Sequence, residues 1–224
     1  MDHGGLWQTG GMEFSAETWE LLASAGTEVG YGAGESILRQ GDPPTHVSVL
    51  LSGRVKVLTG SADGTVLLLA VRGPGELLGS MGVIGRHGRS ASVVALEPCV
   101  TRVLGADRFR ALIREHGLEE ALLRRTMRRI LEGEAWRAEL AALPADPRVA
   151  RALERLAAPG VDGLPEVNLD QTEIGQAVGL SRSMVAAALA RFRKRGLVRT
   201  ERRKIVVLDL SGLRALAGSG QLDV

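Results

Sequence analysis

The stretch from Asp170 to Arg195 constrains the fold more strongly than any other part of the sequence. It reads DQTEIGQAVGLSRSMVAAALARFRKR, with apolar residues at helical spacing on both sides of Gly179. Asp170 is positioned to cap a first helix, with Glu173 completing a capping box, and Ser181 is positioned to cap a second helix. Gly179 supplies the backbone freedom that a sharp turn between the helices requires. The stretch therefore predicts a helix-turn-helix, whose second helix can lie in a DNA major groove.

The segment that follows helps to decide what this helix pair does. On its own, the pattern also fits an ordinary helical hairpin with a solvated basic end. Gly196 stops the second helix, and two apolar runs, residues 197–200 and 205–208, then flank the basic segment 201–204. This arrangement predicts a β-hairpin wing with a basic tip, which favours DNA binding over the plain hairpin.

Positive charge is concentrated in the same part of the chain. Residues 1–144 hold 15 Lys and Arg against 17 Asp and Glu, whereas residues 145–224 hold 13 against 9. A module that binds phosphate groups needs such a local excess of positive charge.

Other classes of protein are disfavoured by what the sequence lacks. Cys99 is the only cysteine, so one chain offers neither a disulfide framework nor four thiolates for an iron–sulfur cluster. The sequence has no apolar run of transmembrane length and no signal-peptide pattern, so we expect a cytoplasmic protein without a membrane partner. No paired carboxylates, metal-ligand cluster or Ser/His/Asp set is apparent, so we expect neither an enzyme nor a metal site.

The first half of the chain shows a different pattern. After the Gly-rich residues 1–12, which we expect to be loosely ordered, residues 15–25 predict a short capped helix. From residue 28 to residue 104, short apolar runs alternate with Gly-containing turns. This spacing predicts an antiparallel β-roll or sandwich.

A long helix is predicted over residues 118–143. Leu123, Met127 and Ile130 follow a 4,3 spacing that Glu134 continues. A small roll cannot bury both faces of such a helix, so a partner helix from a second copy explains this seam best; the alternative is a solvated spacer helix. The Pro-containing residues 144–147 then mark a break between domains, and residues 159–168 read as a Gly/Pro linker.

The order of these parts and three local motifs resemble the CRP/FNR (catabolite activator) superfamily of bacterial transcription regulators over nearly the whole chain. The motifs are RQGD followed by LSGRV at residues 39–42 and 51–55, PGELLG leading to RSA at residues 74–79 and 89–91, and IG followed by VGLSR at residues 174–175 and 178–182.

The resemblance implies an α+β fold in three parts. These are an N-terminal cyclic-nucleotide-binding-type β-roll over residues 1–117, a long dimerisation helix over residues 118–143, and a C-terminal winged helix-turn-helix domain over residues 144–224. It also implies a homodimeric, sequence-specific regulator that binds double-stranded DNA, contacts RNA polymerase and is controlled allosterically through the pocket of the roll. The alternative is a ligand-independent regulator whose roll only dimerises and contacts partners.

The effector site of this family is a short turn and helix called the phosphate-binding cassette. The resemblance implies that Gly79 is its glycine and that Arg89 and Ser90 are its phosphate-binding pair. Ser80 stands where the family has a Glu that binds the ribose hydroxyl, and Glu76 lies four residues before that position. A neutral hydroxyl loses the charge-assisted hydrogen bond.

The base-reading element of the family also differs in this chain. The Thr-Ser pair that reads the base in cyclic-AMP-binding members corresponds to Glu134 and one neighbour. We therefore disfavour the standard mode of cyclic AMP binding and leave the effector open, with a cyclic nucleotide as one possibility. Glu134 is a candidate reader of guanine. An alternative role for Arg89 is to tie down its own loop.

The resemblance also identifies candidate DNA contacts. Arg182 matches a base-reading Arg, but Ser183 and Ala187 replace the Glu and Arg of the catabolite activator. Arg182 can form a bidentate contact to guanine O6 and N7, so we expect a half-site different from that of the activator. The remaining candidates, which include the cap of the second helix and phosphate contacts, are Thr172, Ser181, Arg191, Arg193, Arg202, Arg203 and Lys204.

Overall fold

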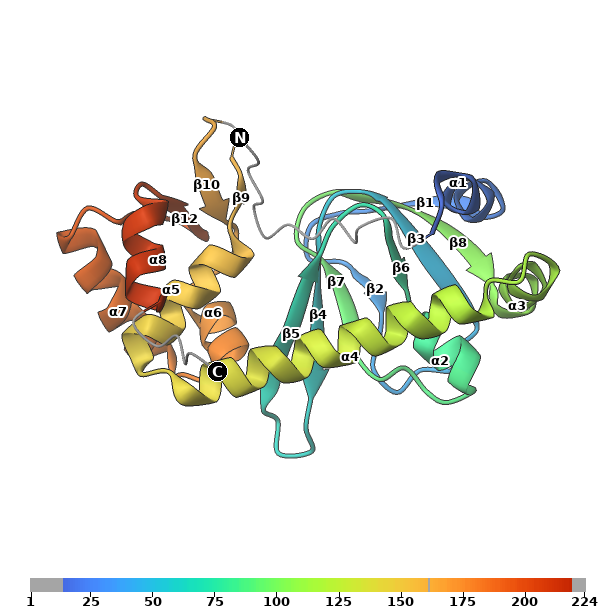
Figure 1. Cartoon of the computed structure of the whole chain (residues 1–224), viewed down its shortest axis with the longest axis horizontal. Helices are drawn as coiled ribbons and strands as arrows, with labels where there is room; N and C mark the ends of the chain where they lie inside the picture. The colour runs from blue at the N-terminus through green and yellow to red at the C-terminus, as the bar shows by residue number, and fades with distance from the viewer. Residues whose placement is uncertain (1–13, 161, 219–224) are drawn as a thin grey trace. The chain divides into compact units, whose positions relative to one another are not determined.

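The computed structural model describes residues 14–160 and 162–218 (Figure 1). The Gly-rich residues 1–12 lie outside the described residues. Contacts divide the chain into two compact units, with the boundary between Gly133 and Glu134, and each unit is described by itself.

The first unit begins with a short capped helix, as predicted. Helix α1 (Ala16–Ser24) starts after Ser15, whose hydroxyl accepts a hydrogen bond from the Thr18 N–H at 3.1 Å. Leu22 is the fully buried residue of this helix and packs into the core of the roll.

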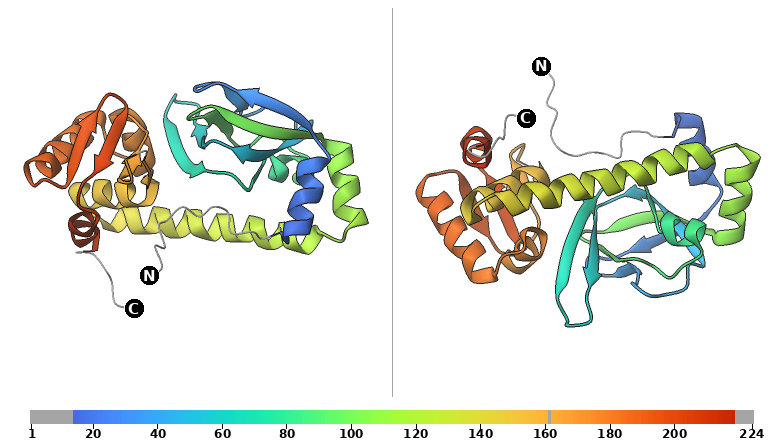
Figure 2. Two further views of the ribbon diagram at one scale, coloured as in Figure 1. Left: turned by 90° about the horizontal axis from the view of Figure 1, so that it is seen from above. Right: turned by 60° about the horizontal axis from the view of Figure 1, so that its bottom comes forward.

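Two four-stranded antiparallel sheets form the predicted β-roll (Figure 2). One sheet has the order β1-β8-β3-β6 and the other has the order β2-β7-β4-β5. The strands are β1 (Thr27–Tyr31), β2 (Ser36–Leu38), β3 (His46–Ser52), β4 (Val55–Gly60), β5 (Val66–Arg72), β6 (Glu76–Leu78), β7 (Ser92–Ala95) and β8 (Cys99–Gly105).

The apolar runs of the sequence are buried in two clusters. Leu50 of β3 packs between the sheets, together with residues of β2, β4, β6, β7 and β8. Val47 and Val49 of the same strand pack with the helices instead, including Phe109 of α3 (Ala106–Glu115) and Leu122 of α4 (Glu119–Ala142). Because β3 contributes to both clusters, both faces of its central part are buried, including the polar Ser48.

Helix α4 corresponds to the long helix that the sequence predicts. It has 24 residues, which corresponds to about 36 Å at about 1.5 Å per residue. Figures 1 and 2 show it as one continuous helix. None of the helices in the described part of the chain is both long and apolar enough to cross a membrane.

The second unit combines helices with a small antiparallel sheet. The helices after α4 are α5 (Ala145–Leu156), α6 (Gln171–Val178), α7 (Arg182–Lys194) and α8 (Leu210–Gly218). The sheet has the order β11-β12-β10-β9, with strands β9 (Ala158–Pro159), β10 (Pro165–Val167), β11 (Val198–Glu201) and β12 (Lys204–Val207). Strands β11 and β12 are the predicted wing.

The segment 159–168 is not the plain linker that its composition predicts. Strand β10 pairs with β9 and also with the wing strand β12, where Glu166 lies opposite Val206. Gly163 has a φ of 75° in the turn between β9 and β10, a conformation that suits glycine. The wing is therefore the outer part of a larger sheet.

Candidate functional site

The helix-turn-helix forms through the local interactions that its sequence predicts. Oδ1 of Asp170 accepts hydrogen bonds from the N–H groups of Thr172 and Glu173, both at 2.9 Å, and Glu173 accepts from the Asp170 N–H at 2.8 Å. This is a complete capping box at the start of α6. Gly179 ends α6 with a φ of 67°, and a Cβ at Gly175 would lie 2.4 Å from the Leu180 carbonyl oxygen. Both glycines are therefore required by the turn.

Helix α7 presents its first turn to solvent. The Ser181 hydroxyl accepts from the Met184 N–H at 3.3 Å and caps the helix. The side chains of Arg182 and Ser183 are exposed, while the opposite face is buried through Val185, Ala188, Leu189 and Phe192. Burial of that face fixes the rotation of α7, so Arg182 and Ser183 face outward at its N-terminal end.

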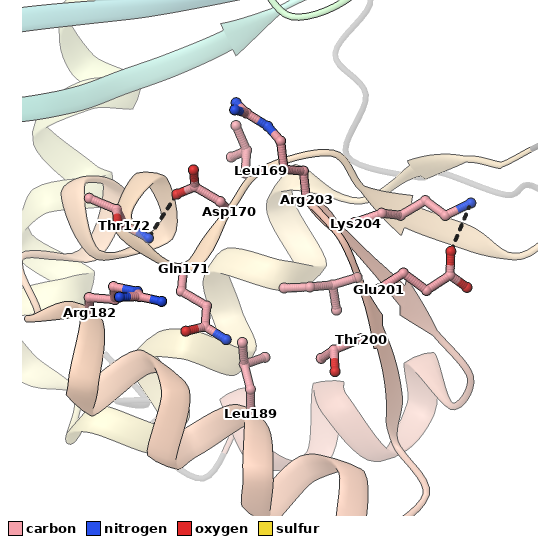
Figure 3. A pocket seen from close by; sticks show the side chains of 11 residues that line it. Leu169, Asp170, Gln171, Thr172, Arg182, Leu189, Thr200, Glu201, Arg203 and Lys204 are labelled. Atoms are coloured by element: carbon pink, nitrogen blue, oxygen red, sulfur yellow. Dashed lines mark hydrogen bonds and ion pairs between the residues drawn. The ribbon is translucent and has the colours of Figure 1, made fainter.

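A cleft of about 310 Å³ separates this turn from the wing (Figure 3). Arg182 lines it from α7, Asp170 and Thr172 line it from the start of α6, and Arg203 and Lys204 line it from the wing. Figure 3 shows Arg182 on one side of the cleft and the wing residues on the other. The cleft therefore brings four of the predicted DNA contacts to one surface.

Several predicted phosphate contacts form ion pairs within the second unit. Arg191 forms a two-point pair with Asp146 of α5, with Nε 2.6 Å from Oδ2, and this hydrogen bond raises the pKa of Arg191. Lys204 lies 3.3 Å from Glu166, which raises the pKa of Lys204. These contacts reduce the net positive charge that the two side chains offer to a phosphate.

The remaining predicted phosphate contacts, two at the wing tip and one on α7, differ in their surroundings. Arg203 has a φ of 56°, which is uncommon for a residue other than glycine, and its guanidinium lies 3.6 Å from Glu173. Arg202 is exposed. Arg193 of α7 donates a hydrogen bond to the Thr200 hydroxyl at 3.0 Å, which links α7 to the wing.

The segment predicted to be the phosphate-binding cassette brings Gly79 and Arg89 together. Gly79 has a φ of 79° and precedes the short helix α2 (Ser80–Gly85), here called the cassette helix. The buried Arg89 donates hydrogen bonds to the carbonyls of Gly79 at 2.8 Å and His46 at 2.5 Å. A Cβ at Gly79 would lie 2.4 Å from Arg89 Nη1, so this packing requires glycine.

The other predicted effector residues differ in exposure. Ser80 is buried, with 4% of its surface exposed, while Ser90 is exposed. Glu134 is exposed on α4 and belongs to the second unit. Within the described residues, no group of three His, Cys, Asp or Glu side chains is arranged to hold a metal ion.

Sequence reasoning missed a buried ion cluster beside the cassette. Glu76 of β6 is only 2% exposed and accepts hydrogen bonds from Arg125 and Arg129 of α4. Arginines four residues apart lie on the same face of a helix, so α4 contacts the strand that leads into the cassette through both of them. The 125/129 spacing is visible in the sequence, but its acidic partner is not.

An apolar stripe on α4 is exposed in the single chain. Leu123, Met127 and Ile130 are 59%, 54% and 46% exposed, and Leu131, which the sequence analysis did not select, is 62% exposed. These four residues are called the α4 stripe below.

Comparisons with known proteins agree with both units. Residues 28–116 match the family described as cyclic nucleotide-binding domain, and residues 147–216 match the Crp-like helix-turn-helix domain. The chain is 31% identical over 192 residues to the cyclic AMP receptor protein of Thermus thermophilus, covering 84% of this chain and 86% of that protein. It is 29% identical over 187 residues to the CRP-like cAMP-activated global transcriptional regulator of Mycobacterium tuberculosis, covering 81% and 84%.

A solved structure is similar along most of the chain as well. It is a CRP-family transcriptional regulator from Thermus thermophilus, with a TM-score of 0.73 and 26% identity, and the match covers 88% of this chain and 100% of that one. These full-length relatives are transcription regulators rather than enzymes.

Proposed function

Because the chain belongs to the CRP/FNR family of transcription regulators, we propose that it binds paired DNA half-sites as a homodimer and reads them mainly through Arg182. Its helix-turn-helix domain binds DNA, as this family does. The observation that carries the specific proposal is the exposed first turn of α7, where a capped helix end presents Arg182 next to a basic wing. An Arg in that position can donate two hydrogen bonds to guanine.

The surroundings of the other candidate residues indicate which role each has in DNA binding. Ser183 offers a small hydroxyl beside Arg182, and Ser181 mainly caps α7. Thr172, Arg193 and Arg202 bind phosphate and set the register of the domain on DNA. Arg191, Arg203 and Lys204 also approach phosphate, although each shares its charge with an acidic neighbour.

The homodimer is supported by the α4 stripe. A dimer gains free energy by removing such a row of apolar side chains from water, at roughly 25 cal/mol per Å². Glu134 continues the stripe with a charged residue, which fits the polar rim of an interface. In this proposal residues 1–117 form the effector part, residues 118–143 the dimerisation helix and residues 144–224 the DNA-binding part.

Control by a small effector at the cassette is the second part of the proposal. Arg89, Ser90 and the backbone next to Gly79 fit an anionic group. Ser80 does not fit the ribose role, and Glu134 does not fit the adenine-reading role, so the residues do not match the standard cyclic AMP mode. The effector is accordingly a small anionic molecule, for which a cyclic nucleotide other than cyclic AMP is one candidate.

One observation favours a ligand-independent regulator instead. Both hydrogen bonds of Arg89 end on backbone carbonyls of the roll, so this side chain already stabilises its own loop. Thermal-shift measurements with cyclic nucleotides and inorganic phosphate separate the two functions. Stabilisation by one of them that disappears in Arg89→Gln supports the effector site, and no stabilisation supports the ligand-independent regulator.

Selection of binding sites from random duplexes tests the DNA proposal. We expect two inverted half-sites whose centres are about 10 bp apart, each with a preferred guanine. Enrichment of a single half-site, or of no sequence, would contradict the proposal. We also propose that the protein acts in the cytoplasm. A DNA-bound regulator of this family is expected to contact RNA polymerase as a further partner.

A further inference from the structure

An apolar hollow on the roll connects the cassette helix with the start of α4. It has a volume of about 430 Å³ and is lined by residues of α2, α3 and α4. Met81 and Ile84 of the cassette helix line one part of it, and Leu123 of α4 lines another. Phe109 and Ile113 of α3 also line the hollow and are themselves buried.

The apolar groups around this hollow are unusually exposed for such large side chains. Met81 is 37% exposed, Ile84 is 48% exposed and Leu123 is 59% exposed. Leu123 also begins the α4 stripe, so the hollow and the stripe form one continuous apolar surface. Continuous exposed apolar surface of this kind marks an interaction site.

The α4 stripe alone is too small to hold a stable dimer. A standard interface removes about 800 Å² from water on each partner and involves about 20–30 residues a side. The stripe offers four large apolar side chains. The interface must therefore include neighbouring surface, and the hollow is apolar surface that adjoins the stripe directly at Leu123.

We infer that the second copy of the chain covers this hollow, so that dimerisation buries Met81 and Ile84 of the cassette helix. The inference rests on the homodimer proposed above and adds a direct contact between the partner and the cassette. Because the cassette helix starts at Ser80, directly after Gly79, a change at the effector site alters a dimer contact, and dimerisation in turn changes effector binding by the same factor.

Charge substitution within the hollow tests this contact. Ile84→Glu is compared with Leu123→Glu and with Leu208→Glu, because Leu208 is exposed to a similar extent, 43%, but lies in the other unit. Sedimentation equilibrium of the full-length chain gives the dimer dissociation constant of each variant. We expect the dimer dissociation constant to rise at least tenfold in Ile84→Glu and Leu123→Glu, and to stay unchanged in Leu208→Glu. If Leu123→Glu weakens the dimer but Ile84→Glu leaves the dissociation constant unchanged, the proposed contact is overturned.

Hydrogen–deuterium exchange of the unmutated chain tests the same contact without relying on a variant. We expect the amides of residues 80–85 to exchange faster when dilution converts dimer to monomer. Exchange that does not depend on concentration overturns the contact. A chain that stays monomeric, even with its selected DNA, overturns the proposed homodimer itself, and so separates the two failures. Saturable binding of decanoate that leaves the dimer dissociation constant unchanged would assign the hollow to a small ligand and overturn the inference.

Discussion

Arg125 of α4 donates a hydrogen bond to Glu76 of β6, and only 3% and 2% of these two side chains are exposed. Arg129 donates to the same carboxylate and is 21% exposed. A carboxylate shared by two guanidinium groups and excluded from water ties the long helix to the strand that leads into the cassette. This cluster connects the part of the fold proposed to bind the effector with the helix proposed to form the dimer.

Glu76→Gln should destabilise the roll strongly. The amide keeps the shape of the side chain but removes its charge, and breaking a buried ion pair costs about 3–5 kcal/mol because the partner charge stays buried. Urea unfolding of the full chain measures this change. Glu97→Gln is the control, since Glu97 pairs with Arg54 while 35% exposed, and should cost less than about 1 kcal/mol. Similar, small losses for both variants would show that the cluster contributes little to stability.

Gly175→Ala should destabilise the DNA-binding unit. The added methyl group would lie 2.4 Å from the backbone oxygen of Leu180, so the turn must shift, at a cost of about 1–3 kcal/mol. Gly218→Ala adds the same group where no atom lies within 4 Å and serves as the control. Thermal unfolding measures both. An unchanged midpoint for Gly175→Ala would mean that α6 and the turn at Leu180 approach less closely than described.

Arg202→Gln should change the salt dependence of DNA binding more than Arg191→Gln. Removing one phosphate contact lowers the slope of log K against log salt by about one. The charge of Arg191 is shared with Asp146, so its removal should change the slope by less. Titrations of a fixed duplex at several salt concentrations measure both slopes. A larger effect at Arg191 would mean that DNA displaces Asp146.

Acid should destabilise the roll through His46. Burial, and then the charge of Arg89, lower the pKa of His46, so the unfolded chain takes up a proton more readily than the folded chain. Stability should therefore fall as the pH drops through about 6.5 and level off below the folded-state pKa. Melting temperatures between pH 5 and pH 8 should depend less on pH in His46→Gln than in the control His116→Gln, whose side chain is exposed. Identical profiles would remove His46 as the cause.

The parts of the fold that depend on short-range patterns could be predicted from the sequence. The capping box at Asp170 and the turn at Gly179 are encoded within ten residues, and the structure contains both. The β-roll follows from its alternating apolar runs and glycine turns. Strand β10 was missed because its three residues begin at a proline shortly after Gly163 and become a strand only by pairing with β9 and β12.

Long-range pairs explain most of what could not be predicted at the sites. Asp146 and Arg191 are 45 residues apart, and Glu76 and Arg125 are 49 residues apart. No local pattern of charge indicates such partners. The resemblance placed Gly79 and Arg89 in the same motif, but the carbonyls that Arg89 contacts become visible only when the loop is folded.

The role of Arg182 as a reader of base sequence is open to a direct test. The decisive measurement compares the affinity of the unmutated chain and of Arg182→Ala for a selected operator and for an unrelated duplex, at one salt concentration. We predict that Arg182→Ala weakens operator binding by about 1–3 kcal/mol per half-site and leaves most of the affinity for the unrelated duplex, whereas Arg202→Ala weakens both equally. Equal losses on both duplexes in Arg182→Ala would contradict the account, because Arg182 would then bind only phosphate.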